Sequence, residues 1–373
     1  MTSPPPLILH IFPSFAVGGA QIRMATLANH FGQQFRHIII ALDQQITCQS
    51  HLDPRLDVQF LPAPPSTGTL PQRLAGIRAT LRAIAPDLLI TSNWGAMEWA
   101  IARFGAGIHR HIHTEDGFGP QEHQTQLRRR ILIRRTALRW SDLVVPSATL
   151  NRIARDIWRL PAHRRHFIPN GVDLARFHPD PNPPAPTRTG LTILCVAALR
   201  PEKNLSRLLR ALALADLTPP PRLRIAGDGP DRATLEQLAQ ILSLNVEFLG
   251  TIADPAAFYR AADLFALSSD TEQMPLSVIE AMSSGLPVIA TDVGDIAAML
   301  APENHILLTA RSDQALAYAF KTTQIIDRRS IGAANRRKAE LLFDITLMTD
   351  HWQALLDPPA QPRKIKPNRA PPE

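Results

Sequence analysis

Two glutamates, Glu272 and Glu280, stand in the stretch TEQMPLSVIEAMSSGLPVIATD, which covers residues 271–292. Proline favours the first turn of a helix and disfavours helical geometry in the residue before it, so we expect a helix to begin beside Pro275. Glu272 would then lie in a loop and Glu280 inside the helix. Carboxylates placed in this way can accept hydrogen bonds from the hydroxyls of a sugar and of a ribose without changing their protonation.

The helix after Pro275 also offers backbone groups to a phosphate. The first N–H groups of a helix lack partners within it and favour an anion, so the amides near Leu276 and Ser277 can bind one. A plainer interpretation stays open, in which Glu272 is a helix-dipole residue and Glu280 is a solvated or capping carboxylate.

Two cations follow a predicted strand in the sequence ALRPEKN, residues 198–204. Arg200 and Lys203 would stand where that strand leaves the carboxyl edge of its sheet, and two positive charges there suit a diphosphate. Helix capping or ordinary surface charge explains the same residues equally well.

Glycines mark two turns between a strand and a helix. Gly18 and Gly19, in PSFAVGGAQIRM, let the backbone approach a ligand closely, and Gly227 lies in IAGDGPD. A plain turn explains the Gly-Gly pair equally well and is the favoured interpretation of IAGDGPD taken alone. The Gly-Gly pair does not form the GxGxxG pattern of dinucleotide-binding proteins.

The segment RHIHTEDGFG, residues 110–119, leaves three interpretations of His113. Strand alternation places it with His109, His111 and Glu115 on one face, which could form a metal site. It could instead be a histidine satisfied at a strand end, or one that contacts a substrate in a cleft. Because both faces of a central parallel strand are usually covered, the metal site is the least favoured of the three.

Short apolar segments alternate with helical stretches in both halves of the chain. Several are apolar on successive residues, as parallel strands covered on both faces require. The alternation predicts an α/β fold with two Rossmann-like doubly wound domains that face each other across a cleft, where ligands bind at the carboxyl ends of the strands. The predicted strands are LILHIF, RHIIIAL, VQFL, DLLITS, RHIHT and DLVVPS, then LTILCVAAL, RLRIAG, VEFLG, DLFALSS and PVIATD.

The proline-rich segment HPDPNPPAPTRTG divides these two series of strands. We expect a first domain at residues 1–178, a linker at 179–190 and a second domain at 191–342, with a helix at 345–356 completing the first domain. The tail, residues 358–373, is rich in proline and charge and is expected to be disordered.

The chain has 373 residues, a net charge of +7 and a pI near 10.1. It has no run of about 18 apolar residues, and its start, MTSPPPLILH, lacks the features of a secretory signal, so we expect a cytoplasmic protein. Cys48 and Cys195 lack zinc or redox spacing, so we expect both to be reduced and partly buried. Charge alone admits nucleic acid as a partner, but no recognisable module supports it.

Arginines are densest in QLRRRILIRRTALRW, residues 126–140. A basic amphipathic helix that ends in a tryptophan is typical of a membrane surface, so we expect Arg128–Arg139 to contact anionic lipid at the inner face of the cytoplasmic membrane. Internal packing of the apolar side, with a merely solvated basic face, is the alternative. The spacing predicts an apolar side made of Leu127, Ile131, Leu132, Ala137 and Leu138.

Taken together, these motifs resemble the retaining glycosyltransferases of family GT4, which have the two-domain GT-B fold. The resemblance runs from Leu7 to Leu356, and its most specific part is the Glu-x7-Glu pattern in EQMPLSVIE, followed by AMSSGLPVIATDVGD. The flanking segments LRPEKN, AGDGP, FLGTI, AADLFALSS and PNGVD fall in the family's order. The resemblance implies transfer of a sugar from a UDP- or GDP-sugar to a glycan or lipid-linked acceptor, in cell-envelope or exopolysaccharide synthesis, without a metal or other cofactor.

The resemblance also implies a role for each motif. Lys203, with Arg200, would neutralise the leaving diphosphate, and Glu272 would hold the sugar while Glu280 holds the ribose. His113 would contact the donor sugar and stabilise the transition state. The implied donor-binding residues are Gly18, Gly19, Gly227, Gln273, Met274, Pro275, Leu276, Ser277 and Glu280.

Two positions depart from the family pattern. Gln273 stands where a glycine usually follows the first glutamate. Ala198 stands at the position of an arginine five residues before the lysine, so Arg200 would have to take its place. A nucleotide-sugar binding protein without transfer activity therefore stays an alternative, as does an epimerase of the same fold.

Overall fold

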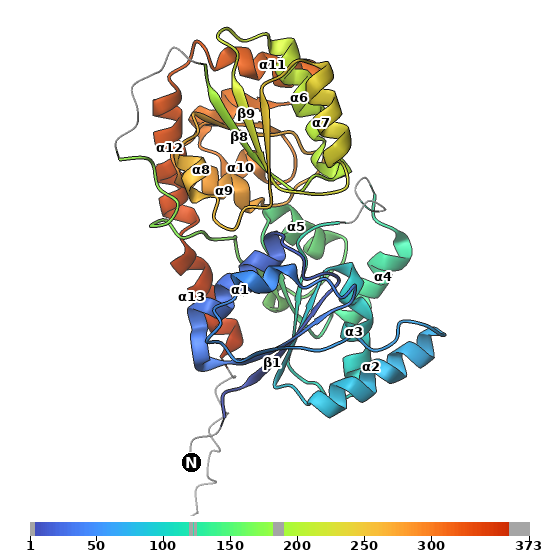
Figure 1. Ribbon diagram of the computed structural model, residues 1–373. Coiled ribbons are helices and arrows are strands. Elements are labelled where there is room, and N and C mark those ends of the chain that lie inside the picture. Colours follow the sequence, from blue (N-terminus) through green and yellow to red (C-terminus); the bar gives the residue numbers. More distant parts are fainter. Residues whose placement is uncertain (1–3, 119–121, 123–124, 182–189, 358–373) are drawn as a thin grey trace, which may run out of the picture.

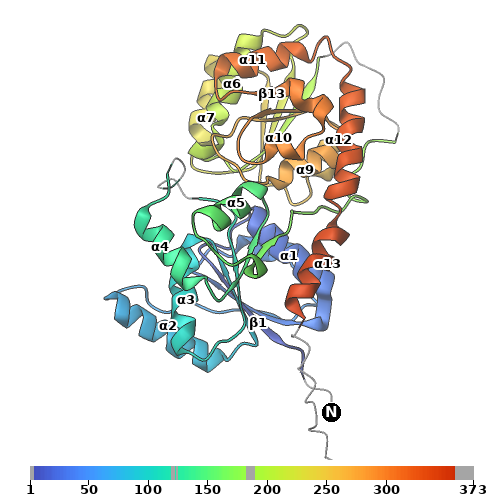
Figure 2. The same ribbon diagram turned by 180° about the vertical axis from the view of Figure 1, so that it is seen from behind.

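The computed structural model describes residues 4–118, 122, 125–181 and 190–357. It contains two parallel β-sheets, each with helices packed on it, and Figures 1 and 2 show one half of the molecule stacked on the other. This arrangement confirms the predicted α/β fold with two doubly wound sheets. Most of the predicted linker and the whole predicted tail lie outside the described residues.

The first sheet has seven strands in the order β3-β2-β1-β4-β5-β6-β7, all paired in parallel. Its strands are β1 Leu7–Phe12, β2 Arg36–Ala41, β3 Val58–Phe60, β4 Leu88–Ser92, β5 His111–Thr114, β6 Asp142–Val145 and β7 Arg165–Phe167. Its helices are α1 Gly19–Phe31, α2 Leu70–Ile84, α3 Met97–Ala102, α4 Arg128–Ala137 and α5 Ala148–Asp156.

The second sheet has six parallel strands in the order β10-β9-β8-β11-β12-β13. Its strands are β8 Thr192–Val196, β9 Arg222–Ala226, β10 Val246–Gly250, β11 Leu264–Leu267, β12 Val288–Thr291 and β13 Leu308–Thr309. Its helices are α6 Leu205–Ala215, α7 Arg232–Ile241, α8 Ala256–Arg260, α9 Leu276–Ser283, α10 Ile296–Met299, α11 Asp313–Thr322 and α12 Arg328–Leu342.

Burial explains the strand sequences. Five of the six residues of β1, LILHIF, are buried, because helices cover both faces of its sheet and every side chain meets apolar neighbours. The two cysteines are also buried and unpaired, Cys48 in the first half and Cys195 in the second. Burial raises the pKa of each thiol to about 12, so both remain protonated small hydrophobes, as predicted.

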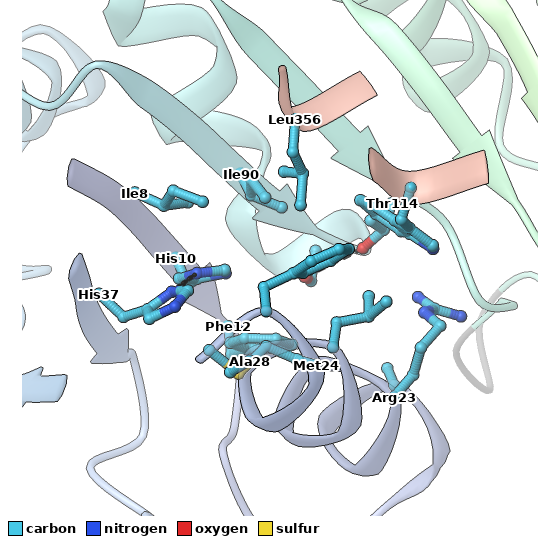
Figure 3. Close-up of a pocket in the computed structure, with 15 residues that line it drawn as sticks. Ile8, His10, Phe12, Arg23, Met24, Ala28, His37, Ile90, Thr114 and Leu356 are labelled. Atoms are coloured by element: carbon cyan, nitrogen blue, oxygen red, sulfur yellow. Dashed lines mark hydrogen bonds between the residues drawn. The ribbon is translucent and has the colours of Figure 1, made fainter. Parts of the chain in front are cut away.

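The last helix, α13 (Ile345–Leu356), joins the two halves. After α12 has packed on the second sheet, the chain returns along one side of the molecule, and α13 lies beside α1 in Figures 1 and 2. Trp352 and Leu356 of α13 are buried in the same apolar cluster as Ile8 and Ile90 of the first sheet. A small cavity of about 40 Å³ remains between α1, α13 and the strands (Figure 3).

Two histidines line that cavity as a neutral pair. His10 Nε2 and His37 Nδ1 lie 3.0 Å apart on neighbouring strands, and Figure 3 shows the two rings side by side. Burial lowers the pKa of His37 to about 4 and the pKa of His10 well below its usual value, in the latter case with help from His37. A charged imidazolium is costly here because most of the side chains that line the cavity are apolar and both histidines are buried.

We expect this pair to weaken the fold in mild acid. In an unfolded chain both histidines take up a proton near pH 6.5, so between about pH 6.5 and 4 the unfolded state binds more protons than the folded one. The free energy of unfolding therefore falls as the pH drops through that range, by up to ~1.4 kcal/mol per pH unit for each histidine. Urea denaturation at pH 7.5 and pH 5.5 measures the loss.

The double variant His10→Leu/His37→Leu should lose less stability between these two pH values than the unaltered protein. His109→Asn, at an exposed position, is the matched control and should keep the original pH dependence. An equal loss in the double variant would show that the pair does not cause the acid sensitivity.

Candidate functional site

A lysine and a glutamate meet at the carboxyl edge of the second sheet. Lys203 ends a short 3-10 helix, Pro201–Lys203, after β8, and Glu272 lies in the loop between β11 and α9. Lys203 Nζ is 2.6 Å from Glu272 Oε1, which also accepts a hydrogen bond of 2.7 Å from the Ser269 hydroxyl. The structure thus brings together the predicted diphosphate cation and the predicted sugar carboxylate, and each neutralises the other before a ligand binds.

The second glutamate is held by a tyrosine that the sequence did not indicate. Glu280 lies within α9, as predicted, and its Oε2 accepts a hydrogen bond of 2.7 Å from the Tyr259 hydroxyl. Burial raises the pKa of Glu280, while the Tyr259 hydrogen bond and the charge of Arg176 act in the opposite direction. The Tyr259 ring is fully buried, so this contact fixes the direction of the carboxylate.

At the start of α9, the amides of Leu276 and Ser277 have no hydrogen-bond partner among the described residues. Pro275 precedes the helix in an extended conformation and supplies no side-chain cap for its first amides. Helix N-terminal amides that lack a cap favour an anion, because they carry partial positive charge and no partner within the helix. The predicted phosphate contacts at Leu276 and Ser277 therefore have the required local structure.

The loop before α9 lies against the first half of the molecule. Gln273 Oε1 accepts a hydrogen bond of 2.9 Å from the Ser147 hydroxyl, and the Met274 carbonyl accepts one of 2.9 Å from Asn170 Nδ2. A side chain at Gly19 would stand 3.9 Å from Leu276 Cδ1, so the predicted glycine turn also faces this loop. The predicted donor-binding residues 273–276 thus form part of the contact between the two halves.

Among the described residues, no hydrogen bond or ion pair joins the side chain of Arg200 or His113 to Lys203 or Glu272. The Arg200 side chain is exposed, and its carbonyl accepts the backbone amide of Lys203 at 3.0 Å. His113 is fully buried in the first sheet, where its Nδ1 lies 2.7 Å from the Thr91 hydroxyl. Its Nε2 is 3.8 Å from Glu115 Oε2 and has no hydrogen-bond partner among the described residues.

His111 shares the Thr91 hydroxyl with His113, which confirms that the two histidines occupy one face of β5. Its other ring nitrogen, Nδ1, lies 2.7 Å from the Ser141 hydroxyl. Among the residues that the structure describes, no group of three or more histidine, cysteine, aspartate or glutamate side chains is placed to hold a metal ion. The histidines of β5 instead bond to the hydroxyl groups of Thr91 and Ser141 within the core.

The predicted basic helix is divided between the interior and the surface. Arg134 of α4 is fully buried, where it pairs with Glu115 and Glu122 and stacks on the rings of Trp94 and Trp158. Ala137 and Leu138 are buried as well, but Leu132 is 62% exposed. The predicted apolar side is confirmed at Ile131, Ala137 and Leu138, which pack in one core cluster, and is wrong at Leu127 and Leu132, which are exposed. Arg134 was not predicted to be buried, and the buried glutamates and aromatic rings around it are the reason that it is.

An aromatic and basic surface remains on the outside of α4. Trp140 is 58% exposed and packs edge-on against Phe104 in the turn after α3, with ring centres 5.8 Å apart. Arg139 lies over the Trp140 ring at 5.9 Å, and the other exposed arginines of this segment are Arg128, Arg129 and Arg135. We call Phe104, Leu132, Trp140 and these four arginines the α4 surface. No helix in the described part of the chain is long and apolar enough to cross a bilayer.

Gly227 has a clear packing role. Its φ is +139°, and a Cβ atom there would stand 1.9 Å from the Ala197 carbonyl oxygen, so the loops after β8 and β9 can meet only if this residue is glycine. Its amide donates to the Gly250 carbonyl at 2.7 Å. These contacts favour the plain turn, and a donor contact at Gly227 stays a prediction.

We expect Gly227→Ala to lower the free energy of unfolding by about 2–4 kcal/mol, because it adds both backbone strain and a steric clash. The matched control is Gly76→Ala on the exposed side of α2, where an added Cβ meets nothing within 4 Å. That change should be neutral or stabilising, because alanine is the better helix former. Urea unfolding of both variants decides, and equal stabilities would exclude the packing role.

Two family sequence models match the chain in succession. Residues 17–176 match the family described as Glycosyltransferase Family 4, and residues 180–336 match Glycosyl transferases group 1. One relative is a putative teichuronic acid biosynthesis glycosyltransferase, TuaC of Bacillus subtilis, with 32% identity over 46% of this chain and 45% of the relative. Another is a GDP-mannose-dependent alpha-mannosyltransferase of Mycolicibacterium smegmatis, with 35% identity over 48% of each chain. The chain thus spans about half the length of the curated relatives that it matches.

Solved structures agree with the whole described fold. HepE of Anabaena, in complex with UDP and glucose, is similar with a TM-score of 0.78 and 20% identity over 94% of this chain and 99% of that one. Sucrose-phosphate synthase of Thermosynechococcus elongatus is similar with a TM-score of 0.77 and 23% identity over 94% and 98%. At these identities the likeness concerns the fold.

Proposed function

Because the chain belongs to glycosyltransferase family 4, a family of the GT-B fold, we propose that it transfers a sugar from a nucleotide-diphosphate sugar to a hydroxyl group, with retention of configuration. The observation that carries this proposal is the Lys203–Glu272 contact at 2.6 Å, at the carboxyl edge of the second sheet. The second half, residues 191–342, would bind the donor. The first half, residues 1–178 completed by α13, would receive the acceptor.

The donor would lie across the start of α9. Its phosphates would accept hydrogen bonds from the amides of this helix and pair with Lys203, while Glu272 would turn from lysine towards the hydroxyls of the sugar. Glu280, oriented by Tyr259, would accept from the ribose. UDP is bound in the HepE structures, and several relatives are named for GDP-mannose, so UDP- and GDP-sugars are the donors to test first.

Transfer would proceed on one face of the sugar. The bond from the anomeric carbon to the diphosphate oxygen breaks, a bond to the acceptor oxygen forms on the same face, and the acceptor's proton passes to the leaving diphosphate. Lys203, assisted by Arg200 and the α9 amides, would stabilise the negative charge that develops there, without a metal ion. His113 stays a predicted transition-state contact, through its backbone or its imidazole; its ring is fully buried against Thr91 in this structure.

A donor screen tests the proposal. Nucleotides and nucleotide-diphosphate sugars are added singly, and a ligand that binds the folded protein should raise the midpoint of thermal unfolding. Stabilising donors are then incubated with glycan and lipid-linked acceptors, with and without a chelator, and the products are analysed. Binding without transfer across the panel would favour the binding-protein alternative, and conversion of the donor in the absence of acceptor would favour an epimerase.

We expect Lys203→Ala to lower the turnover number by about 10²–10³ without unfolding the protein, because it removes charge stabilisation that is strongest in the transition state. Lys321→Ala, at an exposed position of α11, is the control for loss of a lysine and should leave turnover unchanged. Steady-state kinetics at saturating donor measure the effect. Turnover within threefold of the unaltered protein would remove Lys203 from the mechanism.

We propose further that the α4 surface contacts anionic lipid at the inner face of the cytoplasmic membrane, near a lipid-linked or cell-envelope acceptor. The support is local: Leu132 and Trp140 are exposed among four exposed arginines, a combination that suits the headgroup region of a bilayer. The named functions of relatives such as TuaC, in teichuronic acid biosynthesis, are consistent with acceptors of this kind.

Flotation with anionic liposomes tests this membrane contact. We expect binding at low salt that weakens as salt is added, and that is lost when the four arginines of the α4 surface are replaced by glutamine. Absence of binding at low salt would dismiss the contact. A control with the same change of charge, on exposed residues of the other half, should still float; its substituted residues are Arg222, Arg311, Arg329 and Arg337.

A further inference from the structure

Helix α5, in the first half of the molecule, has its first two amides bonded to a side chain of the second half. The Ala148 amide donates to Asp295 Oδ2 at 2.5 Å, and the Thr149 amide donates to Asp295 Oδ1 at 3.1 Å. The next amide, that of Leu150, donates to the Ser147 hydroxyl oxygen of the same half. The N-terminus of α5 is therefore fully capped only while the two halves stay in contact.

The same aspartate is bonded through its backbone to the predicted donor loop. The Asp295 amide donates to the Gln273 carbonyl at 3.1 Å. At the neighbouring Gly294, a Cβ atom would stand 2.1 Å from the Glu272 carbonyl oxygen, so the two backbones pack directly on each other. A displacement of Asp295 must therefore move Glu272 and Gln273 as well.

A third contact fastens the loop to α5 from the other side. The Ser147 hydroxyl accepts from Leu150 and donates to Gln273 Oε1, so it is shared by the helix and the donor loop. The glycine that the family usually carries at position 273 has no side chain that could reach Ser147. The side chain of Gln273 thus adds a contact between the halves that a glycine would not make.

We propose that Asp295 is a positioning residue for sugar transfer, which couples the contact between the two halves to the placement of Glu272 beside Lys203. This proposal rests on the proposed glycosyl transfer. Asp295 is only 6% exposed. A carboxylate at such a site needs hydrogen-bond donors that offset its lost hydration. The α5 amides and the positive end of that helix supply them, so separation of the halves removes the partners of a buried charge.

The contact can be broken from either side without substituting Lys203 or Glu272. Asp295→Ala removes the acceptor. Ala148→Pro removes one of the two donors, and proline is tolerated at the first position of a helix. The site suits it, because Ala148 is exposed and Ser147 before it is extended, with φ −117° and ψ 146°, the conformation that precedes proline.

The first measurement reports the contact between the halves without any substrate. Spin labels are attached at Ala79→Cys on α2 and Gln240→Cys on α7, both exposed positions; the two native cysteines are buried. Double electron–electron resonance measures the distance between the two labels, and its distribution should be narrow for the unaltered protein. It should broaden towards longer distances in Asp295→Ala and in Ala148→Pro, with no further change in the double variant, because both remove the same interaction.

The second measurement reports the placement of Glu272. We expect kcat/KM for the donor to fall at least tenfold in each single variant, and the double variant to be no slower than the worse of the two. Asp295→Asn, which keeps one acceptor oxygen, should recover part of the loss. Asp292→Ala, on the same loop but exposed, is the matched control and should change neither measurement.

Each outcome decides the proposal. Unchanged distance distributions in both single variants would show that Asp295 does not hold the halves together. Broadened distributions with unchanged kcat/KM would show that the contact exists but does not position the donor loop. If the unaltered protein transfers no sugar, the proposed function fails, and the distance measurement by itself still decides whether Asp295 joins the two halves.

Discussion

Pairing of partly buried charges at the carboxyl edge of the second sheet is the constraint on which the candidate site depends. Parallel strands deliver their following loops to one edge, and β8 and β11 are neighbours, so Lys203 and Glu272 arrive 2.6 Å apart. Either charge alone would be costly at this depth. As a pair they are balanced in the absence of ligand, yet each can exchange its partner for a phosphate or a hydroxyl.

Most strands could be predicted, because burial on both faces appears in the sequence as successive apolar residues. LILHIF and RHIIIAL became β1 and β2, and the five predicted strands of the second half became β8 to β12. Two edge strands were missed, β7 with three residues and β13 with two. Such short strands carry little periodicity, and their pairing depends on a neighbour already in place. The third short edge strand, β3, also has three residues and was predicted from the apolar segment VQFL.

The candidate site was predictable only where the signal is local. Pro275 placed Glu280 in a helix and Glu272 in a loop, and the structure confirms both positions. Their partners are distant in sequence: 21 positions separate Glu280 from Tyr259, and 69 separate Glu272 from Lys203. The contact between Ala148 and Asp295 spans 147 positions. Which tyrosine or aspartate completes such a contact follows from the packing of whole elements, and no spacing rule contains that information.

The arginine-rich helix shows why residue type does not separate surface from interior. A rule that places leucine inside and arginine outside inverts Leu132 and Arg134, of which the leucine is exposed and the arginine buried. Burial of Arg134 is tolerated because Glu115 and Glu122 neutralise its guanidinium and aromatic rings cover the faces of that group. Arg130 and Arg134 are both paired with Glu122, so the charge that α4 presents to a partner is smaller than its sequence suggests.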